Sequence, residues 1–141
     1  MTIMALDIGG KRIGIAISDS GILAAPHSVL QRKSRNSDFA SLRQLMEALK
    51  VERVIVGVPY SLSGPDPVGP QARRILRYAE ALAKTVPVPF EYFDESYSTV
   101  DAEQLLQASG QNRVSIDAAA AAVILQNYLD SVNSTSKTVK N

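Results

Sequence analysis

The 141-residue sequence contains no cysteine, and this absence removes several kinds of site at once. Disulfides, thiolate metal ligands and a cysteine nucleophile are all excluded. The single histidine, His27, follows Pro26 in a segment with strand character, so we expect a structural role for it rather than catalysis. A chain without cysteine suits the cytoplasm, where we expect this protein to be.

Long apolar runs and a strong net charge are missing as well. The longest apolar stretch, residues 118–125, is far shorter than the roughly 20 residues of a membrane-spanning helix, and the first residues lack the pattern of a signal peptide. We therefore expect no membrane association. The formal net charge is +1, so any nucleic-acid binding must come from local basic patches. No aromatic-rich stretch offers a stacking platform for bases, which favours recognition of nucleic-acid structure over sequence.

What is present is the composition of a globular protein. Apolar residues make up 45% and charged residues 21% of the chain, and its length fits one domain with a true core. We expect a single domain over residues 1–130. The polar residues 131–141 are expected to form a disordered tail.

The order of the apolar patterns predicts an α/β fold. Strand patterns occupy residues 3–8, 13–17, 22–30, 53–58 and 90–93, and helical patterns occupy residues 39–49, 70–84, 98–110 and 115–130. Ser37 or Asp38 is the expected cap of the first helix, and Pro70 is expected to begin the second. Residues 61–69 hold several glycines and prolines and predict a loop. Short turns followed by alternating strands and helices predict a mixed five-stranded sheet: an antiparallel three-stranded meander extended by parallel strands, with helices on both faces.

Asp7 is the most informative residue, because it is a lone carboxylate in an apolar strand that ends at Gly9 and Gly10. Burying an ionised carboxylate costs on the order of several kcal/mol unless a cation compensates it. Lys11 and Arg12 could compensate it, and so could a metal ion. Alternatively, Asp7 lies at the exposed end of the strand and caps the turn.

Two further acidic sites could meet Asp7 at one edge of the sheet. Asp94 and Glu95 follow the last strand, and only one of them can face the same side as Asp7. Asp117 heads the apolar stripe of the last helix, although an acid there also complements the helix dipole. Carboxylates without cysteine or clustered histidine favour a hard cation such as Mg²⁺ or Mn²⁺. Two such ions can hold a scissile phosphate and activate water.

Basic side chains cluster in two places, one in the connector before the first helix and one on the second helix: Arg32, Lys33 and Arg35, and Arg73, Arg74 and Arg77. We expect the connector residues to contact a phosphate backbone, the main source of nucleic-acid affinity. The helical arginines are expected to form ordinary solvated surface.

Four segments, residues 5–19, 56–59, 94–95 and 115–120, stand in the order found in a known family. Through them the sequence resembles the YqgF/RuvX family over nearly its whole length, to about residue 129. That family has a ribonuclease H-like fold, and its members are described as Holliday-junction resolvases and as pre-16S rRNA nucleases.

The resemblance implies a site and an activity. The implied metal-binding catalytic acids are Asp7, Glu95 and Asp117, with Asp94 as a reserve metal ligand. Lys11 and Arg12 match the family's basic pair and are implied to contact phosphate. The implied activity is a Mg²⁺- or Mn²⁺-dependent endonuclease for structured nucleic acid, with pre-16S rRNA processing in ribosome biogenesis as the leading role.

Three alternatives stay open. A Holliday-junction resolvase acting on DNA would need a homodimer, whereas an RNA nuclease can act as a monomer or a homodimer. A non-catalytic RNA-binding assembly factor is favoured by Ser96, which stands where the family usually has arginine, and by the altered loop after Pro59. An actin-like or sugar-kinase-like ATPase also places Asp-x-Gly in a hairpin, but it binds nucleotide between two lobes, and this chain is long enough for one.

Overall fold

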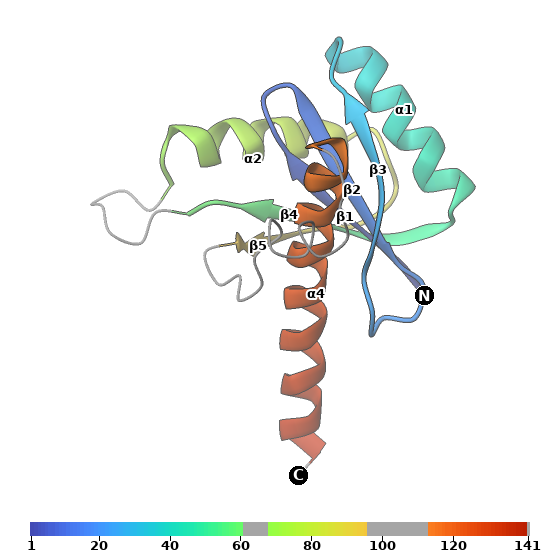
Figure 1. The fold of residues 1–141 in the computed structure, drawn as a ribbon, viewed down its shortest axis with the longest axis vertical. Helices are drawn as coiled ribbons and strands as arrows, with labels where there is room; N and C mark the ends of the chain where they lie inside the picture. Colours follow the sequence, from blue (N-terminus) through green and yellow to red (C-terminus); the bar gives the residue numbers. More distant parts are fainter. Residues whose placement is uncertain (61–67, 96–112, 141) are drawn as a thin grey trace.

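The computed structural model describes residues 1–60, 68–95 and 113–140, with side chains of the last helix described from residue 116 to residue 133 (Figure 1). Five strands form one sheet in the order β3-β2-β1-β4-β5. Their bounds are β1 Thr2–Ile8, β2 Arg12–Ser18, β3 Ala25–Gln31, β4 Val51–Val58 and β5 Phe90–Asp94. The first three strands pair antiparallel, and β1–β4 and β4–β5 pair parallel. The predicted mixed sheet is therefore confirmed.

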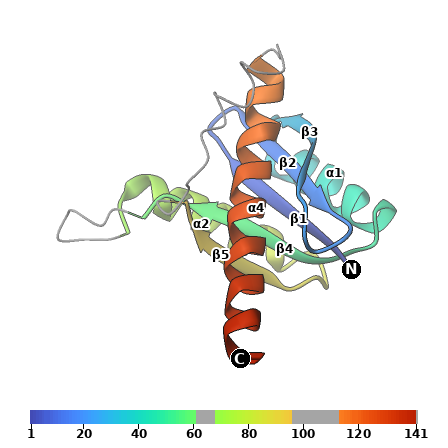
Figure 2. The same cartoon turned by 60° about the horizontal axis from the view of Figure 1, so that its bottom comes forward.

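The helices cover both faces of this sheet, as predicted. Helices α1 (Arg35–Ala48) and α2 (Pro70–Ala83) lie on one face, and α4 (Arg113–Lys140) crosses the other (Figure 2). Strand β1 shows the division, because alternate side chains of a strand point to opposite faces. Its residues Met4 and Leu6 are buried with α1 and α2, whereas Ile3 and Ala5 are buried with α4.

The face under α1 and α2 is packed with large side chains. Leu42 of α1 and Leu82 of α2 are almost fully buried, and each contributes about 1.5–3 kcal/mol of apolar burial. The rings of Phe39 and Tyr78 meet edge to face with their centroids 5.1 Å apart, which joins the two helices. Pro70 is in the first turn of α2, as expected.

The face under α4 includes small residues at the points where the helix comes close to the sheet. Ala121 and Ala122 of α4 are buried against this face, and a Cβ atom at Gly57 of β4 would lie 2.5 Å from the Cδ1 atom of Ile124. Only a glycine at position 57 therefore leaves enough space for the Ile124 side chain of the helix. Within the part of the chain that the structure describes, no helix combines the length and the apolar character that crossing a membrane requires.

Two element boundaries differ from the prediction near serines. Strand β3 begins at Ala25 rather than residue 22, because the Ser20 hydroxyl accepts hydrogen bonds from the backbone N–H groups of Ile22 and Leu23 and holds a turn there. Helix α1 is capped by Ser34, whose hydroxyl accepts from the Ser37 N–H at 3.2 Å, and not by Ser37 or Asp38.

The last helix also differs from the prediction in where it ends. The backbone of α4 is helical to Lys140, past the expected end at residue 130. No glycine or proline follows Leu129 to stop the helix, and the Asn133 side chain donates to the Gly21 carbonyl at 3.2 Å. The predicted helix over residues 98–110, most of the loop after Tyr60, and Ser96 lie outside the described residues.

Candidate functional site

Asp7 lies at the end of β1 on the face that α4 covers. It follows Ile3 and Ala5 in the alternation of the strand, and its backbone partner in β2 is Gly14. Asp7 is half-buried rather than exposed at a turn, so it is not a simple cap. Its position between two strands and beneath a helix restricts the water that can solvate its charge.

Gly14 determines how closely α4 approaches Asp7. A Cβ atom at Gly14 would collide with the backbone carbonyl of Asp117. The helix therefore rests directly on the backbone of β2, beside the residue that pairs with Asp7. This contact brings residues 7 and 117 together although 110 positions separate them in the sequence.

Asp117 lies beyond the first turn of α4, since the helix begins at Arg113. The helix dipole acts mainly within the first turn, so it does not account for the acid at this position. The Asp117 Oδ2 atom instead forms an ion pair with the Nε of Arg12 at 2.6 Å. Arg12 begins β2, directly after the Gly9–Gly10 turn, and so the turn supplies the cation that holds the Asp117 carboxylate.

Glu95 is the acid after β5 that belongs with Asp7. Phe93 packs against the α4 core, with its ring centroid 5.9 Å from that of Tyr128. Glu95 directly follows the last residue of β5, Asp94, and is two positions past Phe93. The electrostatics agree, because the charge of Asp7 acts on the Glu95 carboxyl.

Two of the acids at this end, Asp7 and Glu95, have a raised pKa. Burial, followed by the charge of Asp117, raises the pKa of Asp7 to about 6. Burial, followed by the charges of Asp7 and Asp94, raises the pKa of Glu95 to about 7. Both shifts have the sign expected when carboxylates are desolvated near like charges. Perturbed carboxyls of this kind are characteristic of functional sites.

Asp7 interacts electrostatically with each of the other two acids, Asp117 and Glu95. The three do not form a closed set of metal ligands. Among the described residues, no three acidic or histidine side chains already stand as one metal-holding group. The donor chemistry nevertheless fits a hard divalent cation, because the side chains that meet at this edge offer oxygen atoms and repel one another. A cation between Asp7 and its neighbours would offset that repulsion.

The basic residues predicted from the sequence are divided between the two faces. Arg12 joins the acids, and Lys11 is exposed in the turn before it. Arg32 lies near the opposite face, where its Nη1 donates to the Gly9 carbonyl at 2.6 Å and its guanidinium stacks over the ring of Tyr78 at 4.4 Å. Lys33 and Arg35 are exposed beside it, outside the acidic site.

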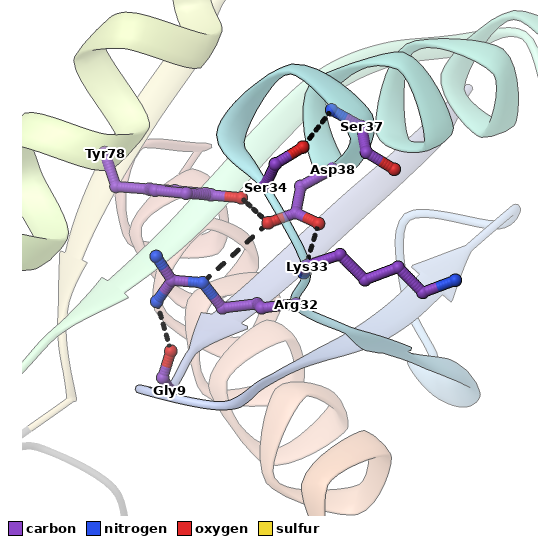
Figure 3. A network of polar contacts seen from close by, with 7 residues as sticks. All are labelled: Gly9, Arg32, Lys33, Ser34, Ser37, Asp38 and Tyr78. Carbon is purple, nitrogen blue, oxygen red and sulfur yellow. Dashed lines mark hydrogen bonds and ion pairs between the residues drawn. The ribbon is translucent and has the colours of Figure 1, made fainter.

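One polar network was not predicted as part of any site (Figure 3). Asp38 is 3% exposed, accepts hydrogen bonds from the Tyr78 hydroxyl at 3.2 Å and the Lys33 N–H at 3.0 Å, and lies 4.0 Å from the Nε of Arg32. The sequence did carry a signal for it. Asp38 shares its helix stripe with Leu42 and Met46, so its side chain had to be buried.

His27 has no part in either group of charges. Its side chain is exposed on β3, and its Nδ1 is 2.8 Å from the Ser28 hydroxyl. The non-catalytic role expected for His27 stays a prediction.

Comparison with known proteins gives a family match over almost the entire domain. The family model RuvX, described as Holliday junction resolvase, matches residues 1–131. A protein of Thermoanaerobacter pseudethanolicus named "Putative pre-16S rRNA nuclease" is 38% identical over 137 residues, which cover 93% of this chain and 97% of that protein. A protein of the same name from Desulforamulus reducens is 41% identical over 136 residues, covering 93% and 98% of the two chains.

Solved structures match at the level of the fold. Thermus thermophilus RuvC in complex with a Holliday junction substrate has a TM-score of 0.61 at 14% identity and covers 96% of this chain and 97% of RuvC. The fowlpox virus resolvase bound to Holliday junction DNA has a TM-score of 0.56 at 11% identity, covering 94% and 99% of the two chains. The predicted ribonuclease H-like fold class is thereby confirmed.

Proposed function

The chain belongs to the RuvX family, and on that premise we propose that it is a divalent-metal-dependent endonuclease that hydrolyses phosphodiester bonds in structured nucleic acid. The observation that supports this most directly is the half-buried Asp7 carboxyl, whose pKa is raised by burial and by the charge of Asp117 and which itself raises the pKa of Glu95. A cluster that resists ionisation in this way is suited to binding cations.

In this proposal Asp7, Glu95 and Asp117 hold Mg²⁺ or Mn²⁺, and Asp94 is a reserve ligand. Such ions stabilise the charge that develops on a phosphate and activate water as the nucleophile. The chain therefore needs no nucleophilic side chain of its own. Metal binding requires ionised carboxylates, so we expect cutting to increase between about pH 6 and pH 8 as Asp7 and Glu95 lose their protons.

Arg12 has a positioning role in this scheme. Its Nε holds Asp117 Oδ2 at 2.6 Å, which fixes the carboxylate and offsets part of the negative charge at the site. Lys11, exposed in the adjoining turn, is placed to contact a backbone phosphate. In this proposal Arg12 is therefore the cation that serves the acids, and Lys11 is the cation that contacts the substrate.

Pre-16S rRNA is the substrate that we favour, because relatives that match more than nine-tenths of this chain carry the name pre-16S rRNA nuclease. The alternative is cleavage of four-way DNA junctions, which the description of the family model suggests. Symmetric cleavage of two strands would require a homodimer.

The test compares wild type with Asp7→Asn on pre-16S rRNA and on a four-way DNA junction, with Mg²⁺, Mn²⁺ or EDTA. We expect metal-dependent cutting by wild type and a loss of at least about a hundredfold in Asp7→Asn. Asp19→Asn is the matched control, because Asp19 is exposed near the other end of β2. Cutting that persists in EDTA or in Asp7→Asn would contradict the catalytic assignment. RNA binding without cutting in any divalent ion would favour the assembly-factor alternative.

A further inference from the structure

A second charged site lies on the sheet face opposite the acids. It is a cavity of about 420 Å³ between the β1–β2 turn and helices α1 and α2. Its lining includes the glycine turn and four arginines: Gly9, Gly10, Arg32, Arg35, Arg74 and Arg77. The connector arginines and the helical arginines, which are separate in the sequence, therefore form one surface, which we call the arginine pocket.

The arginine pocket has an excess of positive charge. Among the residues that the structure describes, no carboxylate lines it, and Asp38 is buried beside Arg32. Within the described residues, no carboxylate lies within ion-pair distance of Arg35, Arg74 or Arg77. Four positive charges around one cavity repel one another, and an anion in the cavity would relieve the repulsion.

Part of the pocket is held rigid before any ligand arrives. Arg32 is fixed by the Gly9 carbonyl at 2.6 Å, by the Tyr78 ring at 4.4 Å and by the buried Asp38 (Figure 3). Arg35 lies 5.9 Å from the centroid of the same ring. Since ordering a long side chain costs free energy on binding, arginines that are already fixed bind an anion more tightly.

The chemistry of the pocket favours phosphate over a whole nucleotide. Arginine pairs with phosphate oxygens through two parallel hydrogen bonds, and four of them can surround one such group. A base would need an aromatic face on which to stack. Tyr78 is only 3% exposed and its ring is already covered by Arg32, so it offers no such face.

The pocket and the acids lie at the same end of the sheet. Gly9 lines the pocket and is two residues past Asp7, which corresponds to about 7 Å along an extended chain. A nucleic-acid strand that crosses the β1–β2 turn therefore reaches both sites. We propose that the arginine pocket binds a backbone phosphate of the substrate strand, next to the phosphodiester that is cut; this inference rests on the proposed nuclease function.

The test is RNA binding by the double variant Arg74→Ala/Arg77→Ala, measured in EDTA by fluorescence anisotropy over a range of KCl concentrations. Loss of one phosphate contact lowers the slope of log K against log[KCl] by about 0.7–0.9, and we expect a loss of affinity of about tenfold near physiological salt. The matched control is Arg73→Ala, because Arg73 is also exposed on α2 but does not line the pocket. Both variants are first compared with wild type by thermal melting.

The outcomes separate this inference from the proposed function. If the double variant binds RNA with the affinity and salt slope of wild type, the pocket assignment is wrong, whether or not wild type cuts. If wild type cuts nothing with any metal, the catalytic proposal fails instead, and the binding measured in EDTA still reports on the pocket.

A separate titration distinguishes a strand phosphate from a free anion. Inorganic phosphate, compared with KCl at equal ionic strength, is expected to change the melting temperature of wild type and of the double variant by the same small amount. Strong stabilisation of wild type alone, with RNA binding unaffected by the double substitution, would show that the pocket holds free phosphate and would overturn the inference.

Discussion

The two faces of the sheet meet their helices in different ways and carry opposite charges at the same edge. Helix α4 lies on backbone and small side chains, at Gly14 and Gly57, and delivers a carboxylate beside Asp7. Helices α1 and α2 pack through Phe39, Tyr78 and other large side chains, and they border a cavity that arginines line. Close backbone contact can bring like charges together, whereas bulky packing leaves room between helices for a ligand.

The strongest test of this difference between the two faces is Gly14→Ala, which adds one carbon atom beneath α4. The new Cβ would meet the backbone carbonyl of Asp117, which cannot rotate away. We expect a loss of about 3 kcal/mol in the free energy of unfolding, or roughly 10 °C in Tm, and loss of cutting as Asp117 moves. In Gly10→Ala the Cβ meets nothing within 4 Å, so its Tm should stay near wild type. Equal melting of the two variants would show that α4 does not depend on this contact.

The opposite face is tested by Asp38→Ala, which removes the buried acceptor of Tyr78 and leaves Arg32 without its ion pair. We expect a loss of about 2–3 kcal/mol, since a buried hydroxyl and a backbone N–H lose their partner. Tyr78→Phe removes one hydrogen bond and should cost only about 1 kcal/mol. Chemical denaturation measures both values. A change below about 0.5 kcal/mol in Asp38→Ala would mean that water replaces the carboxylate.

The pH dependence of stability reports on the acidic edge. Because the pKa of folded Asp7 is about 6, above its ordinary value of 3.8, the folded state holds the proton more tightly than the unfolded state. The Asp7 contribution to stability is therefore present at low pH and is lost as pH rises from about 4 through 6, and the contribution of Glu95 is lost through about 7. Asp7→Asn removes the repulsion between residue 7 and the neighbouring acids. Its Tm at pH 8 should therefore exceed that of wild type, by about 3–5 °C for each kcal/mol gained in the free energy of unfolding. Asp19→Asn should keep the wild-type pH profile.

The smallest expected effect is that of Arg12→Gln on stability. The side chains of Arg12 and Asp117 are 30% and 27% exposed, so solvent screens their ion pair and its contribution is about 1 kcal/mol or less. The Tm difference from wild type should shrink further in 1 M KCl, where the Debye length is about 3 Å. Thermal melts at two salt concentrations measure this, and a large salt-independent loss would mean that Arg12 also has a packing role.

Much of the fold could be predicted because local patterns and global topology agree. Two apolar runs joined by Gly9 and Gly10 can form only a hairpin, and alternating strands and helices after it require parallel pairing. Boundaries were less predictable where a serine hydroxyl competes for backbone N–H groups, as at Ser20 and Ser34. The helical backbone beyond residue 130 was not expected, since polar composition does not reveal a contact such as that of Asn133 with Gly21.

The site was only partly predictable, because sequence gives the position of a charge and not its partner. Strand alternation indicated only that one of Asp94 and Glu95 faces the side of Asp7, and the family resemblance selected Glu95. The sequence did not indicate that Arg12 would pair with Asp117. The assignment of Asp7, Glu95 and Asp117 as metal ligands stays a prediction. The helical arginines Arg74 and Arg77 were expected to be plain surface, and only tertiary structure places them beside Arg32.

Helix α4 is held in place by side-chain contacts at two regions along its length. The Gln126 side chain donates to the Ile22 carbonyl and accepts from the Ala24 N–H, both at 2.9 Å, while Arg12 holds Asp117. About 24 Å of helix separates Asp117 from Asn133. The contacts of Gln126 and Asn133 set the rotation of the helix about its axis. A single residue inserted between the two anchorages would turn one against the other by about 100°. The contacts of α4 with the β2–β3 connection, far from the acids, thus help to fix the rotation of the helix. That rotation determines the direction in which the Asp117 carboxylate points.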